Sequence, residues 1–381
     1  MFSIRCHLVK SNKRYSIFVS NISYMSIMSS NSNMSIISSI NWNNSTVDSI
    51  VDNKKISLDT IRDIYEFSLR SLRLSNRSLS YGQSTLCEED DASLLVLSSL
   101  SLPLLGSNMT KNNFILDDGI KKYSSKILTR SNKIDIIKRL QQRIVNKTPI
   151  AYLVNGCYQQ GEYFYVNNNV IIPRSFIGEI LADKNINELI DIKNIENVCD
   201  VCTGSGALAI LSKKYLPNVK KVHAIDICPL AIEVCKINVK NKNLNKMINV
   251  YQSDLFNNIN DKNKYDLILC NPPYVDKRGM SKLPVEYEHE PKISLFGGTS
   301  GLDIIERLIT SITPFLNDDN SGLLLEIGRT QQQLQKRFPE FCEKAVWLST
   351  TYSDDEVLYI TKKDITNTTI AKTTISKTSI P

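Results

Sequence analysis

Asn271-Pro272-Pro273-Tyr274 is the segment of this 381-residue chain whose residue types and spacing best define a reaction centre. An apolar run, expected as a strand at 267–269, leads directly into it. The two prolines fix φ and donate no N–H, so their loop presents carbonyl oxygens rigidly. A planar amide nitrogen is a weak nucleophile. It can be aimed at an incoming methyl group if the Asn271 side-chain oxygen and the Pro272 carbonyl accept its N–H bonds, while Tyr274 packs its ring on the amide. Such a transfer needs no general base beforehand, and catalysis consists of positioning.

A second constellation is the turn Asp200-Val201-Cys202-Thr203-Gly204-Ser205-Gly206, which follows an apolar run at 198–201. Ligands of open α/β sheets bind outside the carboxyl ends of the strands. Gly204 and Gly206 let the backbone approach a ligand where a Cβ would clash. Asp226 ends the next apolar run and can accept hydrogen bonds from both hydroxyls of a ribose.

Asp254 follows a third such run and suits the exocyclic amine of an adenine, although it could equally cap a helix. Taken alone, the glycine turn with Asp226 also fits a dinucleotide fingerprint, so a nicotinamide-dependent oxidoreductase stays open at this point. A hydride-transfer enzyme has no use for the Asn-Pro-Pro-Tyr tetrad, which therefore favours methyl transfer.

The bulk composition excludes several classes of protein. Hydrophobic residues at 42% and charged residues at 22% are near globular averages. The net charge of +7 suits an acidic or RNA-associated partner but equally a plain soluble protein. No apolar stretch approaches the roughly 18 residues of a membrane span. Nine scattered cysteines argue against a disulfide scaffold, three histidines argue against a His-based metal site, and no metal is predicted.

Periodicity predicts a helical domain at 48–146 and an α/β domain at 147–363. Helices are expected at 61–69, 92–100 and 135–145 in the first domain. In the second, a hairpin of strands 163–166 and 170–172 precedes a helix at 177–181. Further strands are expected at 198–201, 221–225, 250–252, 267–269 and 322–327, alternating with helices at 207–215, 229–239 and near 302–312. This alternation predicts a doubly wound parallel sheet.

The ends of the chain differ from the middle. Residues 1–47 are basic, rich in Ser and Asn, and contain no acid before Asp48, as in an organelle transit peptide. We expect a mitochondrial address, with a cytoplasmic protein bearing a disordered leader as the alternative. Residues 364–381 are rich in Thr and Lys and are expected to be a disordered tail.

The tetrad and the glycine turn together resemble the glutamine amide methyltransferases of the HemK/Prm type. This resemblance implies a seven-stranded Rossmann-like sheet that binds S-adenosylmethionine, preceded by a small all-helical domain. It implies that Asp200, Gly204 and Gly206 contact the methionine part of the cofactor, Asp226 its ribose and Asp254 its adenine. Thr203, Ser205 and Asn271 are expected to complete the cofactor site. Asn271, Pro272, Pro273 and Tyr274 are expected to hold the acceptor glutamine.

Within the family, the chain is similar to the PrmB branch, which methylates a large-subunit ribosomal protein. Pro173-Arg-Ser-Phe-Ile-Gly-Glu179 replaces the acidic stretch typical of release-factor methyltransferases, and Glu286–Pro291 and Gly298–Asp303 resemble PrmB segments. Two residues depart from that branch: Phe176 stands where proline is usual, and Glu288 where arginine is expected. These departures concern acceptor contacts, not the tetrad. His289 and Glu290 are interpreted as structural, since the transfer needs neither.

Other acceptors remain open alternatives. A peptide-chain release factor also carries a glutamine acceptor, and a nucleic-acid base amine is likewise planar and weakly nucleophilic. The acidic run Glu88–Asp91 argues against a nucleic-acid groove in the helical part. A ribosome-assembly factor without activity is disfavoured because the glycines, Asp226 and the tetrad are all intact. A protein substrate is thus expected, with at most indirect contact to ribosome or RNA and none to a membrane.

Overall fold

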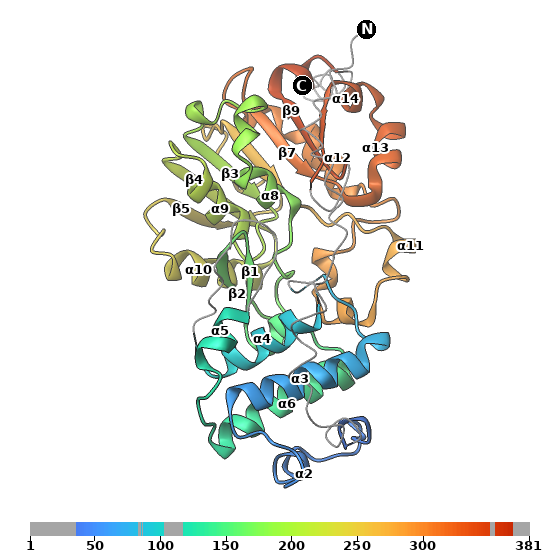
Figure 1. Ribbon diagram of the computed structural model, residues 1–381. Helices are drawn as coiled ribbons and strands as arrows, with labels where there is room; N and C mark the ends of the chain where they lie inside the picture. The colour runs from blue at the N-terminus through green and yellow to red at the C-terminus, as the bar shows by residue number, and fades with distance from the viewer. Residues whose placement is uncertain (1–35, 83–84, 86, 103–116, 351–354, 369–381) are drawn as a thin grey trace. The chain divides into compact units, whose positions relative to one another are not determined.

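The structure of the chain, a computed structural model, describes residues 36–82, 85, 87–102, 117–350 and 355–368 (Figure 1). The chain divides into two compact units, residues 1–154 and 155–381. The division falls after Val154 rather than after Asn146, because the short helix α7 packs against α4 and α6 of the first unit. Among the described residues, no helix combines the length and the apolar character needed to cross a bilayer.

The first unit is helical, and its predicted helices are confirmed. Threonine capping boxes begin two of them: Thr60 at α3 and Thr129 at α6. The apolar stripe of α3 is buried, with Ile61 and Ile64 fully excluded from solvent. The helices are α2 (Val47–Val51), α3 (Ile61–Ser75), α4 (Glu88–Ser99), α5 (Asp117–Tyr123), α6 (Arg130–Asn146) and α7 (Ile150–Leu153).

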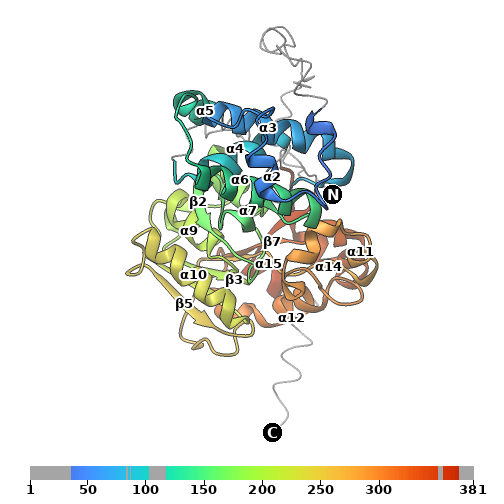
Figure 2. The ribbon, with the colours of Figure 1, turned by 90° about the horizontal axis from the view of Figure 1, so that it is seen from below.

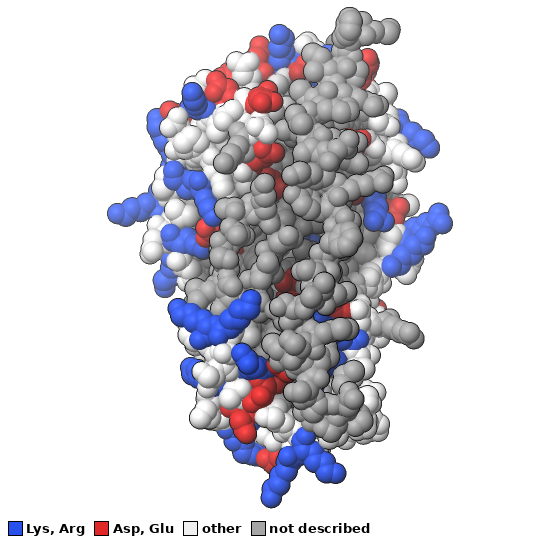
Figure 3. Space-filling view, in the orientation of Figure 1, with Lys and Arg blue, Asp and Glu red and all other residues white. Residues whose placement is uncertain are grey.

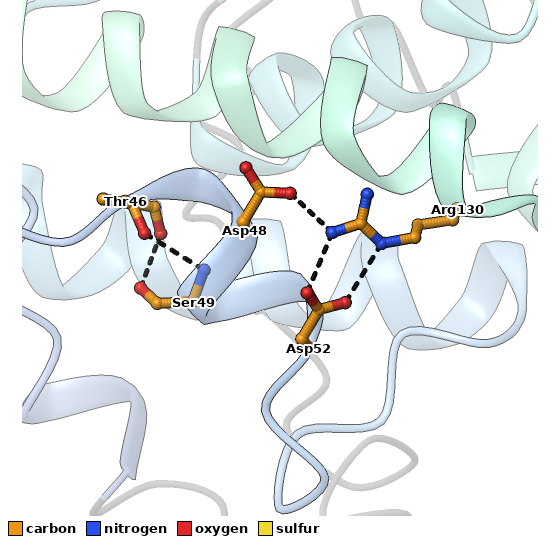
Figure 4. A network of polar contacts seen from close by, with 5 residues as sticks. All are labelled: Thr46, Asp48, Ser49, Asp52 and Arg130. Atoms are coloured by element: carbon orange, nitrogen blue, oxygen red, sulfur yellow. Dashed lines mark hydrogen bonds and ion pairs between the residues drawn. The ribbon is translucent and has the colours of Figure 1, made fainter.

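The segment just before residue 48 is folded onto this unit, which differs from the disorder expected of a leader that reaches residue 47. The Trp42 ring lies 6.2 Å from that of Phe67, and Gln141 donates a hydrogen bond to the Trp42 carbonyl at 2.7 Å. Arg130 joins α6 to α2 by ion pairs to Asp48 at 2.5 Å and Asp52 at 2.8 Å (Figure 4). A leader that extended to residue 47 would include these packed residues; residues 1–35 lie outside the described ones.

The second unit contains a seven-stranded sheet in the order β5-β4-β3-β6-β7-β9-β8. Strands β3 to β7 are parallel, as predicted, but β9 runs antiparallel to both β7 and β8. Residues 349–356 separate β8 from β9, fewer than the dozen or so residues that a parallel crossover needs, so antiparallel pairing is the available geometry. The strands are β3 (Asn197–Val201), β4 (Lys221–Asp226), β5 (Ile248–Gln252), β6 (Leu267–Cys270), β7 (Gly322–Glu326), β8 (Val346–Leu348) and β9 (Val357–Thr361).

Helices cover both faces of the sheet. Cys199, Val201 and Ile225 belong to the apolar core that also contains Ile305 and Leu308 of α12. Helices α8, α9 and α10 pack against β7, β3 and β4 respectively, and Figure 2 shows α9 and α10 beside β3 and β5. The helices are α8 (Phe176–Ala182), α9 (Ala207–Tyr215), α10 (Pro229–Asn241), α11 (Lys277–Met280), α12 (Asp303–Ser311), α13 (Gln331–Arg337), α14 (Pro339–Lys344) and α15 (Lys362–Thr366).

Two predictions at the edges of this unit were wrong. The hairpin consists of β1 (Gly156–Gln159) and β2 (Glu162–Tyr165), whereas residues 170–172 form no strand. Gly161 takes a positive φ of 74° in the turn between β1 and β2, the conformation that favours glycine. The disordered tail was predicted to start at residue 364, which is too early. Helix α15 runs to Thr366, and both Ile365 and Thr368 are buried. Residues 369–381 lie outside the described ones.

Candidate active site

The predicted site residues lie at one edge of the sheet. Strands β5, β4, β3 and β6 are consecutive neighbours and parallel, so their carboxyl ends meet there. Asp254 follows β5, Asp226 ends β4, the glycine turn follows β3, and Asn271 follows β6. Sequence reasoning therefore grouped these residues correctly, and the sheet topology supplies the reason.

The glycine turn is fixed by backbone hydrogen bonds to the neighbouring strand. The Thr203 amide donates to the Ile225 carbonyl at 3.0 Å, and the Gly204 amide donates to Asp226 Oδ2 at 2.9 Å. Gly204 has φ +54°, and a Cβ added there would meet only Ile171, at 3.8 Å. The backbone at Gly204 therefore borders open space that a ligand can approach. Gly206 is required for packing, because an added Cβ would lie 2.7 Å from Cys235 Sγ.

Asp200 is a buried acid with one unused oxygen. Its Oδ2 accepts hydrogen bonds from the Thr203 hydroxyl and, at 2.9 Å, from the Ala209 amide. Its Oδ1 has no hydrogen-bond partner among the described residues. Burial raises the pKa of Asp200 to about 7, against the hydrogen bonds from Thr203 and Ala209 that lower it. A cationic ammonium group would give Oδ1 a partner, so the residues present fit the amino-acid end of S-adenosylmethionine.

The other two acids of the cofactor edge differ in their partners. Asp226 is half-buried, and its Oδ1 accepts a hydrogen bond from the Cys228 amide at 2.9 Å. A carboxylate has further lone pairs, so Asp226 can still accept ribose hydroxyls. Asp254 forms an ion pair with Arg307 of α12 at 2.7 Å, and no helix begins in the described segment between β5 and β6 for it to cap. Its contact with an adenine stays a prediction.

The tetrad follows β6 in a closely packed loop. Pro272 is buried, and Asn271 is half-buried with a side chain that makes no hydrogen bond within the described part of the chain. A Cβ at Gly297 would lie 2.5 Å from the Pro273 carbonyl oxygen, and one at Gly301 would lie 2.4 Å from that of Tyr274. Only glycine allows these approaches, so the 297–301 segment holds the tetrad backbone while the Asn271 amide is left to bind an acceptor.

Tyr274 is linked to a buried acid that sequence reasoning missed. Its hydroxyl donates to Glu326 Oε1 at 2.9 Å, and Glu326 lies at the end of β7 with 2% exposure. The other oxygen, Oε2, accepts from the Ser175 hydroxyl at 2.6 Å and the Phe176 amide at 2.9 Å. The sequence feature that could have pointed to Glu326 is its place at the end of the apolar run Leu323-Leu324-Leu325.

Arg174 anchors the long connection that follows the tetrad. It forms a two-pronged ion pair with the buried Glu290, at 2.6 and 2.7 Å, and its guanidinium lies 5.2 Å from the centre of the Tyr287 ring. The structural interpretation of Glu290 is thereby confirmed. Within the described residues, no group of three or more His, Cys, Asp or Glu side chains is arranged to hold a metal ion.

Comparison with known proteins identifies the family. Residues 184–286 match the family model described as Methyltransferase small domain. A ribosomal protein uL3 glutamine methyltransferase of Bradyrhizobium diazoefficiens is 36% identical over 314 residues, 81% of this chain and 92% of that protein. The chain belongs to this family. Proteins of the same name from Neisseria meningitidis serogroup B and Bordetella pertussis are 36% and 32% identical, covering 81% and 82% of the chain and 95% and 99% of those proteins.

The chain is therefore an S-adenosylmethionine-dependent methyltransferase, as the tetrad and the glycine turn predicted. The seven-stranded Rossmann-like sheet is confirmed as well. The oxidoreductase alternative and the inactive assembly factor are not supported by any of these relatives. The roles of individual residues toward cofactor and acceptor follow from the geometry above and stay predictions.

Proposed function

We propose that this methyltransferase transfers a methyl group to the side-chain amide nitrogen of a glutamine in protein uL3 of its own large ribosomal subunit. The names of its relatives support the acceptor. The observation that carries the chemistry is the tetrad, in which the half-buried Asn271 side chain has no hydrogen bond within the described residues while the loop behind it is fixed by glycine contacts.

The chain's own residues orient the acceptor. The Asn271 side-chain oxygen and the Pro272 carbonyl accept the two N–H bonds of the glutamine amide, which aims the nitrogen lone pair. S-adenosylmethionine supplies an electrophilic methyl group on a sulfonium. Transfer would form the nitrogen–carbon bond as the carbon–sulfur bond breaks, with the thioether as leaving group, and the nitrogen would lose a proton only afterwards. Positioning of this kind replaces a general base and accounts for much of the rate.

Mass spectrometry of ribosomal proteins from cells lacking the chain tests the acceptor. In those cells we expect the uL3 peptide that contains the acceptor glutamine to be lighter by one methylene group, about 14 Da. Restoring the chain should restore the methyl group. Release factors from the same cells provide the second arm. A methyl group lost from a release factor, with uL3 unchanged, would replace the ribosomal acceptor by that factor.

A nucleic-acid amine is the remaining acceptor class. The helical unit has the acidic residues Glu88–Asp91 in the first turn of α4, and on the face drawn in Figure 3 both basic and acidic side chains of the described residues are exposed, which does not favour a basic track. A base-modifying enzyme needs such a track to hold its nucleic acid. Label transferred from S-adenosylmethionine to purified ribosomes should therefore enter protein, and label in RNA would overturn the proposal.

We also propose a mitochondrial address, with the cytoplasm as the alternative. The basic, acid-free composition ahead of Asp48 supports it. The packing of Ile37 and Trp42 in the helical unit favours a leader that ends before residue 36. A fluorescent reporter fused after residue 35 should enter mitochondria, and a reporter that stays cytosolic would count against the address.

A further inference from the structure

Glu326 lies beyond the tetrad in sequence but is bonded to its last residue. A carboxylate that loses nearly all contact with water is costly unless hydrogen-bond donors replace the water. Three donors do so here: the hydroxyls of Tyr274 and Ser175 and the amide of Phe176. Because all three face the two oxygens of one side chain, Glu326 joins the end of β7, the start of α8 and the tetrad.

The Tyr274 ring is constrained at its hydroxyl and along its edge. A Cβ added at Gly328 would lie 2.4 Å from Tyr274 Cε2, so the backbone at Gly328 lies directly against the ring. The hydroxyl is held by Glu326 at 2.9 Å. A ring fixed at both places cannot swing away from the tetrad without breaking a buried hydrogen bond. We propose that Glu326 is a positioning residue that sets the orientation of Tyr274 for the acceptor amide.

The start of α8 supplies Glu326 with a backbone donor as well as a hydroxyl. The Phe176 amide donates to Glu326 Oε2 at 2.9 Å, beside the Ser175 hydroxyl at 2.6 Å. Burial raises the pKa of Glu326, whereas the hydrogen bonds from Ser175, Tyr274 and Phe176 lower it. The additional N–H donor therefore favours the ionised carboxylate that accepts the Tyr274 hydroxyl.

The inference rests on the proposed function for its acceptor, and the test is a double-mutant cycle. Tyr274→Phe, Glu326→Gln and the double variant of the full chain are compared for kcat and KM toward uL3 and for binding of S-adenosylmethionine. We expect each single variant to lose about 10-fold or more in kcat/KM for the acceptor, with cofactor affinity kept within about threefold. Because both changes weaken the same hydrogen bond, from the Tyr274 hydroxyl to Glu326 Oε1, the double variant should be about as impaired as the more impaired single variant.

Further variants separate positioning from general stability. Tyr359→Phe is the matched control, since Tyr359 is a buried tyrosine of β9 whose hydroxyl donates to the Asn320 carbonyl at 3.4 Å, away from the tetrad. It should leave kcat/KM for the acceptor unchanged. Phe176→Pro removes the amide donor together with the phenyl ring at the first residue of α8, where proline is tolerated. It is compared with Phe176→Ala, which removes the ring and keeps the amide. We expect Phe176→Pro to fold and to lose less activity than Tyr274→Phe.

A measurement on the protein without its acceptor tests the role of Glu326 separately from the identity of the acceptor. In protein labelled with 3-fluorotyrosine, the ¹⁹F resonance missing from Tyr274→Phe is assigned to Tyr274. Glu326→Gln should broaden or split this resonance, whether or not uL3 is the acceptor. Wild-type kcat/KM in Tyr274→Phe, fully additive losses in the double variant, or an unchanged resonance would each overturn the inference. Absence of transfer to uL3 by the wild type would overturn only the acceptor.

Discussion

Asn271 is the residue on which the chemistry depends most directly. Its side-chain amide makes no hydrogen bond with the described residues and is assigned to the acceptor, so replacing it removes an acceptor contact and leaves the rest of the cofactor site intact. Asn271→Ala should lower kcat by about 100-fold or more, the usual cost of removing one positioned polar group. Cofactor affinity, measured by calorimetry, should stay within a few-fold of wild type. Asn241→Ala, an exposed position at the end of α10, is the control, and near-normal turnover by Asn271→Ala would exclude the mechanism.

Asp200 makes cofactor binding depend on pH. Its pKa is raised to about 7 by burial, so near neutrality a large share of the free protein carries the protonated, uncharged acid. An ammonium group binds the ionised form, and affinity for S-adenosylmethionine should therefore increase as pH rises from about 6 to about 7.5. Asp200→Asn should bind more weakly and lose this dependence. The measurement is a series of cofactor titrations across pH; a flat series for the wild type would contradict the assigned contact.

Among single residues, the sequence identified those whose conformational constraints act on the neighbouring backbone. The prolines of the tetrad and the glycines of the turn impose their constraints on neighbouring backbone, so their spacing is informative by itself. Glu326 could not be found in this way, because its partners Ser175 and Tyr274 are distant in sequence. Its role emerges only when β7 lies beside β6 in the sheet.

Among the elements, the turn after β7 has a testable effect on the tetrad. Gly328 has φ +50°, and alanine there would collide with the Tyr274 ring. Gly328→Ala should reduce kcat/KM for the acceptor by about 10-fold and destabilise the fold by about 1–3 kcal/mol. Gly82→Ala is the matched control, since Gly82 also has positive φ but nothing within 4 Å of an added Cβ. It should lower thermal stability alone, and equal activity losses in both variants would indicate that the contact with Tyr274 is irrelevant.

The elements that sequence predicted well are those with a strong period. Helix α9 has the predicted bounds, and β3, β4 and β6 differ from prediction by a residue or so at their ends. The hairpin was misassigned because Asn167–Asn169 looked like its turn, whereas the chain turns earlier, at Gln160 and Gly161. Strands β8 and β9 carry apolar residues without a distinctive period, and their pairing depends on contacts between distant segments.

On the scale of the whole molecule, alternation of strands and helices predicted the class of fold but not its antiparallel edge. The family resemblance supplied the number of strands, which periodicity alone did not. The limits of the folded units were also harder to predict than their content, because a polar composition suggests disorder even where a segment is folded. Asn- and Ser-rich residues near Trp42 fold because single apolar side chains and backbone hydrogen bonds attach them to α3 and α6.

Stability of the helical unit should therefore depend on residues 36–47. This segment contributes the buried Ile37, the Trp42–Phe67 ring contact and the carbonyls of Trp42 and Ser45, both hydrogen-bonded by Gln141. A chain beginning at residue 36 is the reference, and a chain beginning at residue 48 lacks these contacts but keeps the Arg130 ion pairs to α2. We expect the shorter chain to lose about 2–4 kcal/mol, mostly from apolar burial, and to melt several degrees lower by calorimetry. Equal melting temperatures would mean that the segment adds nothing to the fold, and a leader cleaved after residue 47 would then be compatible with a stable enzyme.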